Sequence, residues 1–217
     1  MLVRDRMTPN PVTVTPETSF PEAFRLMREH RFRRLPVVDK KGRLVGIVVE
    51  KDMLHASPSA ATSLSVFEIN YLLSKLKVEE VMTSPVITVE GDLPVEEAAR
   101  IMVEHKIGSL PVVDDGKLVG IITETDIFKL FVEILGGGEC PVRITIRVPD
   151  LPGQLARATS VIASIQGNIH AIGSFKGDDP EHLFITMRIE GAGEEAIRRA
   201  LQEAGIELVN VWVAPCE

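Results

Sequence analysis

Gly120-Ile121-Ile122-Thr123-Glu124-Thr125-Asp126 is the stretch that decides the fold, because its pattern predicts a short apolar strand that leads directly into a helix. Thr123 and Asp126 have the spacing of a capping box, in which a hydroxyl and a carboxylate satisfy free N–H groups at a helix start. Such a helix start also offers N–H groups and a positive dipole end to a phosphate. The stretch therefore predicts a structural cap and, in the same place, a candidate ligand site.

The same stretch occurs earlier in the chain as Gly46-Ile47-Val48-Val49-Glu50-Lys51-Asp52, and its surroundings repeat as well. Met7-Thr8 matches Met82-Thr83, and Leu35-Pro36-Val37-Val38-Asp39 matches Leu110-Pro111-Val112-Val113-Asp114. A repeat of this length indicates two copies of one structural unit. The apolar pattern predicts the order β-α-β-β-α for each copy, with a first strand at residues 11–15 in the first copy. Since neither copy has much core of its own, we expect them to pack as a pseudo-two-fold pair.

The pattern changes after Gly136-Gly137-Gly138, where three glycines predict a flexible boundary. Beyond it, alternating and helical periodicities predict a β-α-β-β-α-β order, the ferredoxin-like arrangement, and an α+β fold for the chain. The helix that begins at Gln154 is expected to bury Leu155, Thr159, Ile162 and Ile165. The expected domains are listed in order: 1–58 for the first copy, 59–76 for a linker with a helix whose Leu72 and Leu73 face inward, 77–135 for the second copy, 136–140 for the glycine linker and 141–217 for the last domain.

Composition excludes several classes of protein. The 217 residues carry 24 basic and 31 acidic side chains, and the net charge of −7 argues against a nucleic-acid partner. No apolar run approaches the roughly 18 residues of a membrane helix, and the first residues lack the apolar core of a signal peptide. Cys140 and Cys216 provide no disulfide framework, so a reducing cytoplasm is expected. No spacing of His, Cys, Asp and Glu predicts a metal site.

The motifs of the two copies resemble those of tandem CBS domains, the pair known as a Bateman module. The resemblance rests on Met-Thr, Leu-Pro-Val-Val-Asp and the Gly-x-x-x-x-x-Asp stretch in each copy and covers about residues 1–136. Residues 141–217 resemble an ACT domain through Asp150-Leu151-Pro152-Gly153-Gln154-Leu155 and the order of elements. This order of domains in a short chain is similar to that of the acetoin-utilisation proteins.

The resemblance implies an adenosine nucleotide, such as AMP, ADP or ATP, in clefts between the CBS copies. It assigns Asp126 to the ribose and Thr123 to the phosphate, with Asp52 as the counterpart of Asp126. Val49 stands where the first copy would need the threonine, so the sequence predicts that Asp126 contributes more to binding than Asp52 does. Further cleft residues implied by the resemblance are Arg33, Arg34, Lys129, Val12, Val86, Ile87 and Pro111.

Each assignment has a structural alternative. Arg33, Arg34 and Lys129 also fit solvated surface charge, since Lys and Arg keep their head groups in water. Asp52 also fits a helix cap. Asp150, Pro152, Gly153 and Gln154, which the resemblance makes a weak candidate ACT ligand site, also fit a turn before a helix.

The chain shows no nucleophile elbow and no phosphate loop, so we expect a regulatory protein rather than an enzyme. The resemblance implies self-association as a homodimer or larger oligomer, and a regulated enzyme as a possible partner. Two alternatives stay open: an oligomerisation scaffold without a nucleotide, and an amino-acid sensor of the ACT type.

Overall fold

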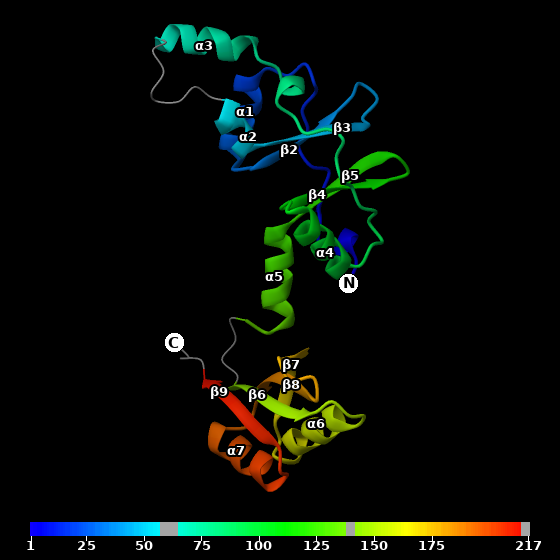
Figure 1. Ribbon diagram of the computed structural model, residues 1–217, viewed down its shortest axis with the longest axis vertical. Helices are drawn as coiled ribbons and strands as arrows, with labels where there is room; N and C mark the ends of the chain where they lie inside the picture. Colours follow the sequence, from blue (N-terminus) through cyan, green and yellow to red (C-terminus); the bar gives the residue numbers. More distant parts are fainter. Residues whose placement is uncertain (57–64, 138–141, 214–217) are drawn as a thin grey trace. The chain divides into compact units, whose positions relative to one another are not determined.

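The computed structural model describes residues 1–56, 65–137 and 142–213. The chain divides into two compact units, Met1–Ile127 and Phe128–Glu217 (Figure 1). Cys140 and Cys216 lie outside the described residues.

The two sequence repeats fold into the same succession of elements, except that strand β1 of the first repeat (Thr8–Pro9) corresponds to a single bridge at Thr83 in the second. The first repeat consists of η1 (Val3–Asp5), β1 (Thr8–Pro9), α1 (Phe20–His30), β2 (Arg34–Val38), β3 (Leu44–Val49) and α2 (Glu50–Ala56). The second consists of η2 (Val78–Glu80), α4 (Val95–His105), β4 (Ser109–Asp114), β5 (Lys117–Thr123) and α5 (Glu124–Ile134). The apolar residues at helical spacing on α1 and α4 are buried, among them Met27 and Met102, except for Phe24 and Ala99, which are half-buried.

Residues 11–15 do not form the predicted strand. Only Val14 pairs there, in a single parallel bridge with Val37. Pro11 and Pro16 flank this segment, and a proline has no N–H group with which to extend a ladder. The second repeat has the equivalent bridge, between Val89 and Val112.

Each repeat gives its N-terminal segment to the other repeat. Strand β1 is antiparallel to β5, with Thr8 opposite Ile121, in a sheet of order β1-β5-β4. In the same way Thr83 pairs with Ile47 of the two-stranded β2-β3 sheet, through N···O distances of 3.1 and 2.8 Å. The two repeats therefore fold as one unit, in which each sheet depends on residues of both copies.

The exchange continues at η1 and η2. The Val3 N–H donates to the carbonyl of Leu93, and the Val78 N–H donates to the carbonyl of Thr18, each over 2.9 Å. Both valines are fully buried, and Val78 belongs to the hydrophobic core of the first repeat. The apolar side chains of one copy are thus covered in part by the other copy.

Two glycines make room for the exchanged methionines. A β-carbon added at Gly120 would overlap the sulfur of Met7, and one added at Gly46 would overlap the sulfur of Met82. Glycine at both positions lets the methionine side chain lie against the backbone, and a larger residue would force that side chain to move. This contact explains why the Met-Thr pair and the glycine occur together in both repeats.

Helix α3 (Val66–Lys75) follows the first repeat. Ser65 and Glu68 form its capping box, with a hydrogen bond of 2.8 Å from the Ser65 N–H to the Glu68 carboxylate. Leu73 packs against the core of the first repeat, as predicted. The prediction was wrong for Leu72, which is 53% exposed, because α3 packs against α1 with its Leu73 side and Leu72 lies outside that contact.

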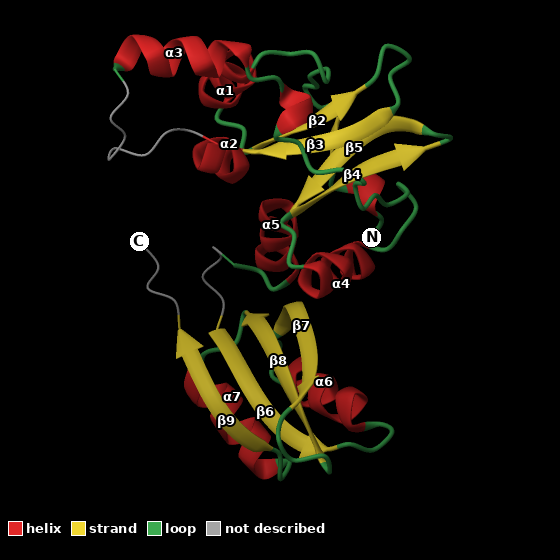
Figure 2. Ribbon diagram, turned by 45° about the horizontal axis from the view of Figure 1, so that its top comes forward, coloured by secondary structure: helices red, strands yellow, loops and turns green. Residues whose placement is uncertain are grey.

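The second unit contains the predicted β-α-β-β-α-β order. Its elements are β6 (Val142–Pro149), α6 (Gln154–Ser164), β7 (Asn168–Lys176), β8 (His182–Glu190), α7 (Glu194–Glu203) and β9 (Glu207–Val213). The four strands form an antiparallel sheet of order β7-β8-β6-β9, and both helices lie on one face of it (Figure 2). The first and last strands are neighbours, as a ferredoxin-like sheet requires.

The helices of this unit bury an aliphatic core against the sheet. Alternate residues of β6 and β8, such as Ile144 and Met187, face that core. On α6 the buried positions are Ala158 and Ile162, whereas Leu155 is exposed. The prediction was wrong for Leu155 because it lies in the first turn, beyond the part of the helix that the sheet covers.

The glycine–methionine contact predicts that Gly120→Ala lowers the free energy of unfolding by about 1–3 kcal/mol, the usual cost of overpacking. Urea unfolding of the full chain, followed by circular dichroism, measures the change. The effect should be smaller in a Met7→Ala background, since that variant removes the overlapping sulfur and the two changes are then not additive.

Gly173→Ala is the control, because a β-carbon there would make only an ordinary contact of 3.5 Å with Leu135. If Gly120→Ala proves as mild as Gly173→Ala, the close approach of Met7 does not constrain the fold.

Candidate functional site

The exchange of segments creates two clefts in the first unit, both at the junction of the repeats. The first has a volume of about 450 Å³, within the range of small-molecule sites. Its walls come from the end of β3 and the start of α2 in one repeat, and from residues 83–87 and 106–109 of the other. The residues that line it are Arg33, Arg34, Ile47, Val49, Glu50, Lys51, Asp52, Thr83, Pro85, Val86, Ile87, Lys106, Ile107, Gly108 and Ser109.

The second cleft, of about 410 Å³, is the counterpart of the first with the repeats interchanged. The residues that line it are Thr8, Asn10, Pro11, Val12, Arg31, Phe32, Arg33, Arg34, Pro36, Ile121, Thr123 and Thr125. Thr8 corresponds to Thr83 and Val12 to Ile87, so the predicted pseudo-symmetry of the repeats extends to the two clefts.

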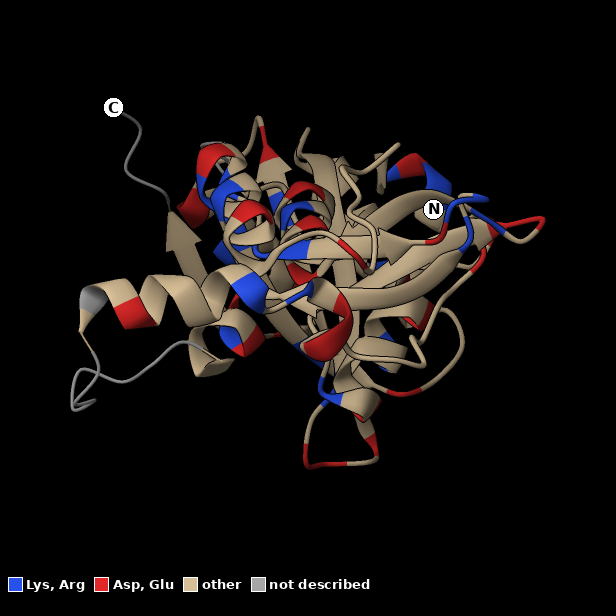
Figure 3. Ribbon diagram, turned by 90° about the horizontal axis from the view of Figure 1, so that it is seen from above, with Lys and Arg blue, Asp and Glu red and all other residues tan. Residues whose placement is uncertain are grey.

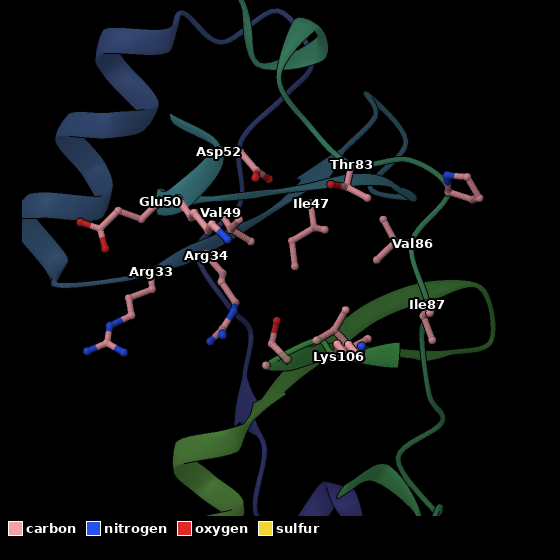
Figure 4. A pocket seen from close by; sticks show the side chains of 15 residues that line it. Arg33, Arg34, Ile47, Val49, Glu50, Asp52, Thr83, Val86, Ile87 and Lys106 are labelled. Carbon is pink, nitrogen blue, oxygen red and sulfur yellow. The ribbon is translucent and has the colours of Figure 1, made fainter. Parts of the chain in front are cut away.

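Arg34 lines both clefts, and its position makes the pair of clefts asymmetric. Its guanidinium occupies the space above Gly108 and forms an ion pair of 3.5 Å with Glu124. In the other repeat the corresponding residue is Ser109, which has no charge to offer. Figure 4 shows Arg34 reaching from the first repeat toward the ribbon of the second, whereas Arg33 extends away from the other side chains.

Thr123 and Asp126 form the predicted cap of α5. The Asp126 carboxylate accepts hydrogen bonds from the Thr123 N–H over 2.9 Å and from the Thr123 hydroxyl over 2.7 Å. The Asp126 N–H in turn donates to the Thr123 hydroxyl over 3.4 Å. One carboxylate oxygen is therefore committed to the helix start, and Asp126 is not among the residues that line the second cleft.

Asp52 is in a different situation although it occupies the equivalent position. Val49 has no hydroxyl to bind it, and no hydrogen bond joins the Asp52 side chain to another residue in the described part of the chain. Asp52 lines the first cleft, and its carboxylate is directed toward Thr83 (Figure 4). The first cleft therefore contains a free acceptor, which a ligand with adjacent hydroxyl groups can use.

The other predicted cleft residues divide into two groups. Val12 lines the second cleft, and Val86 and Ile87 line the first. Lys129 is exposed on α5 and Pro111 is buried in β4, and neither lines a cleft.

The clefts also contain two basic residues that were not expected from the sequence. Arg31 and Lys106 follow α1 and α4 at equivalent positions, each in the left-handed conformation, and line the second and first cleft respectively. Because Arg31 and Lys106 occupy equivalent positions in the two repeats, the alignment of the repeats could have indicated them.

The predicted turn of the last domain is present and leads into α6. Gly153 adopts a φ of 89°, which favours glycine. Asp150 forms an ion pair of 2.7 Å with Lys176, and Pro152 is exposed. The Oε1 atom of Gln154 is buried without a hydrogen-bond partner in the described structure. These residues form a closed turn with one unsatisfied acceptor.

Along the ribbon, segments with Lys and Arg are interspersed with segments with Asp and Glu (Figure 3). Among the described residues, no group of three His, Cys, Asp or Glu side chains is placed to hold a metal ion. No helix among them is long and apolar enough to span a membrane.

Family comparisons match both parts of the chain. The CBS domain model matches residues 3–59 and 78–133, and the model of the TTHA0829-like ACT domain matches residues 137–212. A relative from Methanocaldococcus jannaschii, L-aspartate semialdehyde sulfurtransferase, is 36% identical over 131 residues. That match covers 60% of this chain but only 23% of the enzyme.

Solved structures are similar to the CBS part. The AcuB protein of Vibrio cholerae, named for acetoin utilization, is 34% identical, with a TM-score of 0.53 over 63% of this chain and 93% of its own. The CBS domain pair of protein MJ0100, in complex with 5′-methylthioadenosine and S-adenosyl-L-methionine, is 36% identical, with a TM-score of 0.51 over 60% of this chain and 99% of its own. CBSX2 in complex with AMP is 36% identical, with a TM-score of 0.51 over 61% and 97%.

The different bonding of the two aspartates predicts different stabilities in the absence of any ligand. Asp126→Ala removes the cap of α5 and should cost about 0.5–2 kcal/mol, the usual range for a helix N-cap. Asp52→Ala removes no hydrogen bond and should cost much less. Urea unfolding of both variants, with wild type alongside, measures the difference; equal stabilities would show that the cap contributes nothing.

Proposed function

Because this chain belongs to the CBS-domain family and carries a C-terminal ACT domain, we propose that it is a regulatory protein that senses an adenosine-containing ligand in its CBS clefts. The observation that carries the proposal is the first cleft, where a free carboxylate, apolar walls and basic groups converge. Similar CBS pairs are known in complex with AMP, with S-adenosyl-L-methionine and with 5′-methylthioadenosine, all of which contain adenosine.

The chemistry of the first cleft suits the parts of such a ligand. Asp52 can accept hydrogen bonds from both hydroxyls of a ribose, and an ionised acceptor makes strong ones. Ile47, Val86 and Ile87 offer an apolar surface to adenine. Arg34 and Lys106 supply positive charge for a phosphate or carboxylate at the other end of the ligand.

The second cleft is the weaker site in this proposal. It holds basic residues and the Thr123 hydroxyl, but its aspartate is bound to the start of α5. A ligand that bound the same carboxylate oxygen of Asp126 would compete with the N–H and hydroxyl groups of Thr123. The sequence ranks Asp126 above Asp52, and the geometry favours the opposite order.

Self-association, a role in acetoin utilization and a regulated partner enzyme extend the same proposal. Exposed apolar side chains on α3 support self-association, and the similarity to AcuB supports the metabolic role. The alternatives are an ACT-type amino-acid sensor, which the unsatisfied Gln154 acceptor favours, and a scaffold without a nucleotide.

A thermal-shift panel tests the proposal with AMP, ADP, ATP, S-adenosylmethionine, 5′-methylthioadenosine and a set of amino acids. A ligand at 100 times its dissociation constant should stabilise the protein by about 2.7 kcal/mol. Stabilisation by an adenosine compound supports the sensor. Stabilisation by an amino acid alone favours the ACT-type sensor, and no response across the panel favours the scaffold.

Calorimetry with the best adenosine ligand of the panel decides between the two clefts. Asp52→Ala should weaken binding by about 1–3 kcal/mol, the usual cost of hydrogen bonds lost from a charged group. Asp126→Ala should weaken it less, and Arg34→Ala should affect every bound phosphate because Arg34 lines both clefts. A larger loss for Asp126→Ala than for Asp52→Ala would restore the order that the sequence predicts.

A further inference from the structure

The open face of the ACT sheet, opposite α6 and α7, carries two arginines side by side. Strand register places Arg143 of β6 directly opposite Arg188 of β8, and Arg143 is also opposite Trp212 of β9. Like charges directly opposite each other destabilise a sheet. In a chain of net charge −7, such a pair calls for an explanation.

The guanidinium group of Arg188 has buried donor atoms, Nε and Nη1, without a hydrogen-bond partner in the described structure. Buried donors without a partner cost free energy, and a guanidinium carries several of them in a fixed plane. No ion pair joins Arg143 or Arg188 to a carboxylate among the described residues, whereas Arg147 on the same face pairs with Glu207 over 2.8 Å.

The surroundings hold Arg188 in place. Its guanidinium carbon lies 5.6 Å from the centre of the Trp212 ring, in a cation–π contact. A β-carbon built on Gly136 would come within 2.9 Å of the Arg188 Cδ atom, so the stem of the side chain runs close to that backbone. An arginine that is oriented before binding loses less conformational entropy when a ligand arrives.

Hydroxyl groups form the floor beside the arginines. Thr145 and Thr186 are the next residues on this face, and their hydroxyls hydrogen-bond to each other over 2.9 Å although both are buried. One hydroxyl of such a pair keeps an unused lone pair and the other can turn its proton toward a ligand. Trp212, which is 46% exposed, leaves the neighbouring edge open to solvent.

We propose that Arg143 and Arg188 form a binding site for a small anion of the phosphate or carboxylate class on the open face of the ACT sheet. The planar donors of arginine match the paired oxygens of both groups. An anion bound there would neutralise the facing charges of Arg143 and Arg188. This site is separate from both CBS clefts and from the turn at Asp150–Gln154.

Fluorescence of Trp212, the one tryptophan of the chain, reports on the site directly. The full chain is titrated with inorganic phosphate and, separately, with malonate, at constant ionic strength kept with sodium chloride. We expect a saturable change in emission with at least one of the two anions, and the more effective anion identifies the class. Calorimetry of the same titrations measures binding independently of the fluorophore.

Arg143→Gln and Arg188→Gln should each weaken this binding at least tenfold. Arg147→Gln is the matched control, because it removes the same charge from the same face and strand but from a residue already paired with Glu207. The control should bind the anion as wild type does. Circular dichroism melting checks that the variants fold, and Arg143→Gln carries the test if Arg188→Gln does not.

Two results would overturn the site: no saturable binding of either anion by calorimetry, or an equal loss in Arg147→Gln, which would indicate general charge attraction. An Arg34→Ala variant separates the two proposals, since it removes the positive charge that lines both CBS clefts and should leave the anion response of Trp212 unchanged. If phosphate binding disappears in Arg34→Ala, the anion occupies a CBS cleft and not the ACT sheet.

Discussion

The exchange of N-terminal segments between the two repeats is the constraint on which the rest of the first unit depends. Met7 lies against Gly120 and Met82 against Gly46, and in each case a β-carbon on the glycine would overlap the methionine sulfur and force that side chain to move. Through this contact β1 joins β5, Thr83 joins Ile47, and Val3 and Val78 become buried in the opposite copy. A single repeat would leave these groups exposed to water.

The same exchange builds the clefts and explains their difference. Each cleft takes one wall from each repeat, so a ligand there touches both copies at once. Asp52 and Asp126 occupy equivalent positions, but a threonine precedes one and a valine the other. The hydroxyl draws Asp126 into the helix cap, and its absence leaves Asp52 available to a ligand. The same position in each repeat, Asp52 or Asp126, can therefore serve either a ligand or the start of a helix.

Much of this arrangement could be predicted from the sequence, and the limits have physical causes. The repeat, the helix faces of α1 and α4 and the βαββαβ order follow from local periodicity and turn residues. The swap of Met-Thr segments is invisible to such patterns, because either copy offers a similar partner strand. Whether Asp126 caps the helix or is free to bind a ligand depends on hydrogen-bond geometry, which the sequence does not contain. The pairing of Arg143 with Arg188 needed strand register, which is set by contacts far apart in the sequence.

The central claim is that an adenosine ligand binds at the junction of the two repeats and so holds both copies together. Hydrogen exchange of the full chain, with and without saturating S-adenosylmethionine or AMP, tests it most directly. Exchange should slow together in residues 47–52 of one repeat and 83–87 of the other, because both segments contribute residues to the first cleft. Slower exchange in only one repeat, or binding without any change in these two segments, would contradict it.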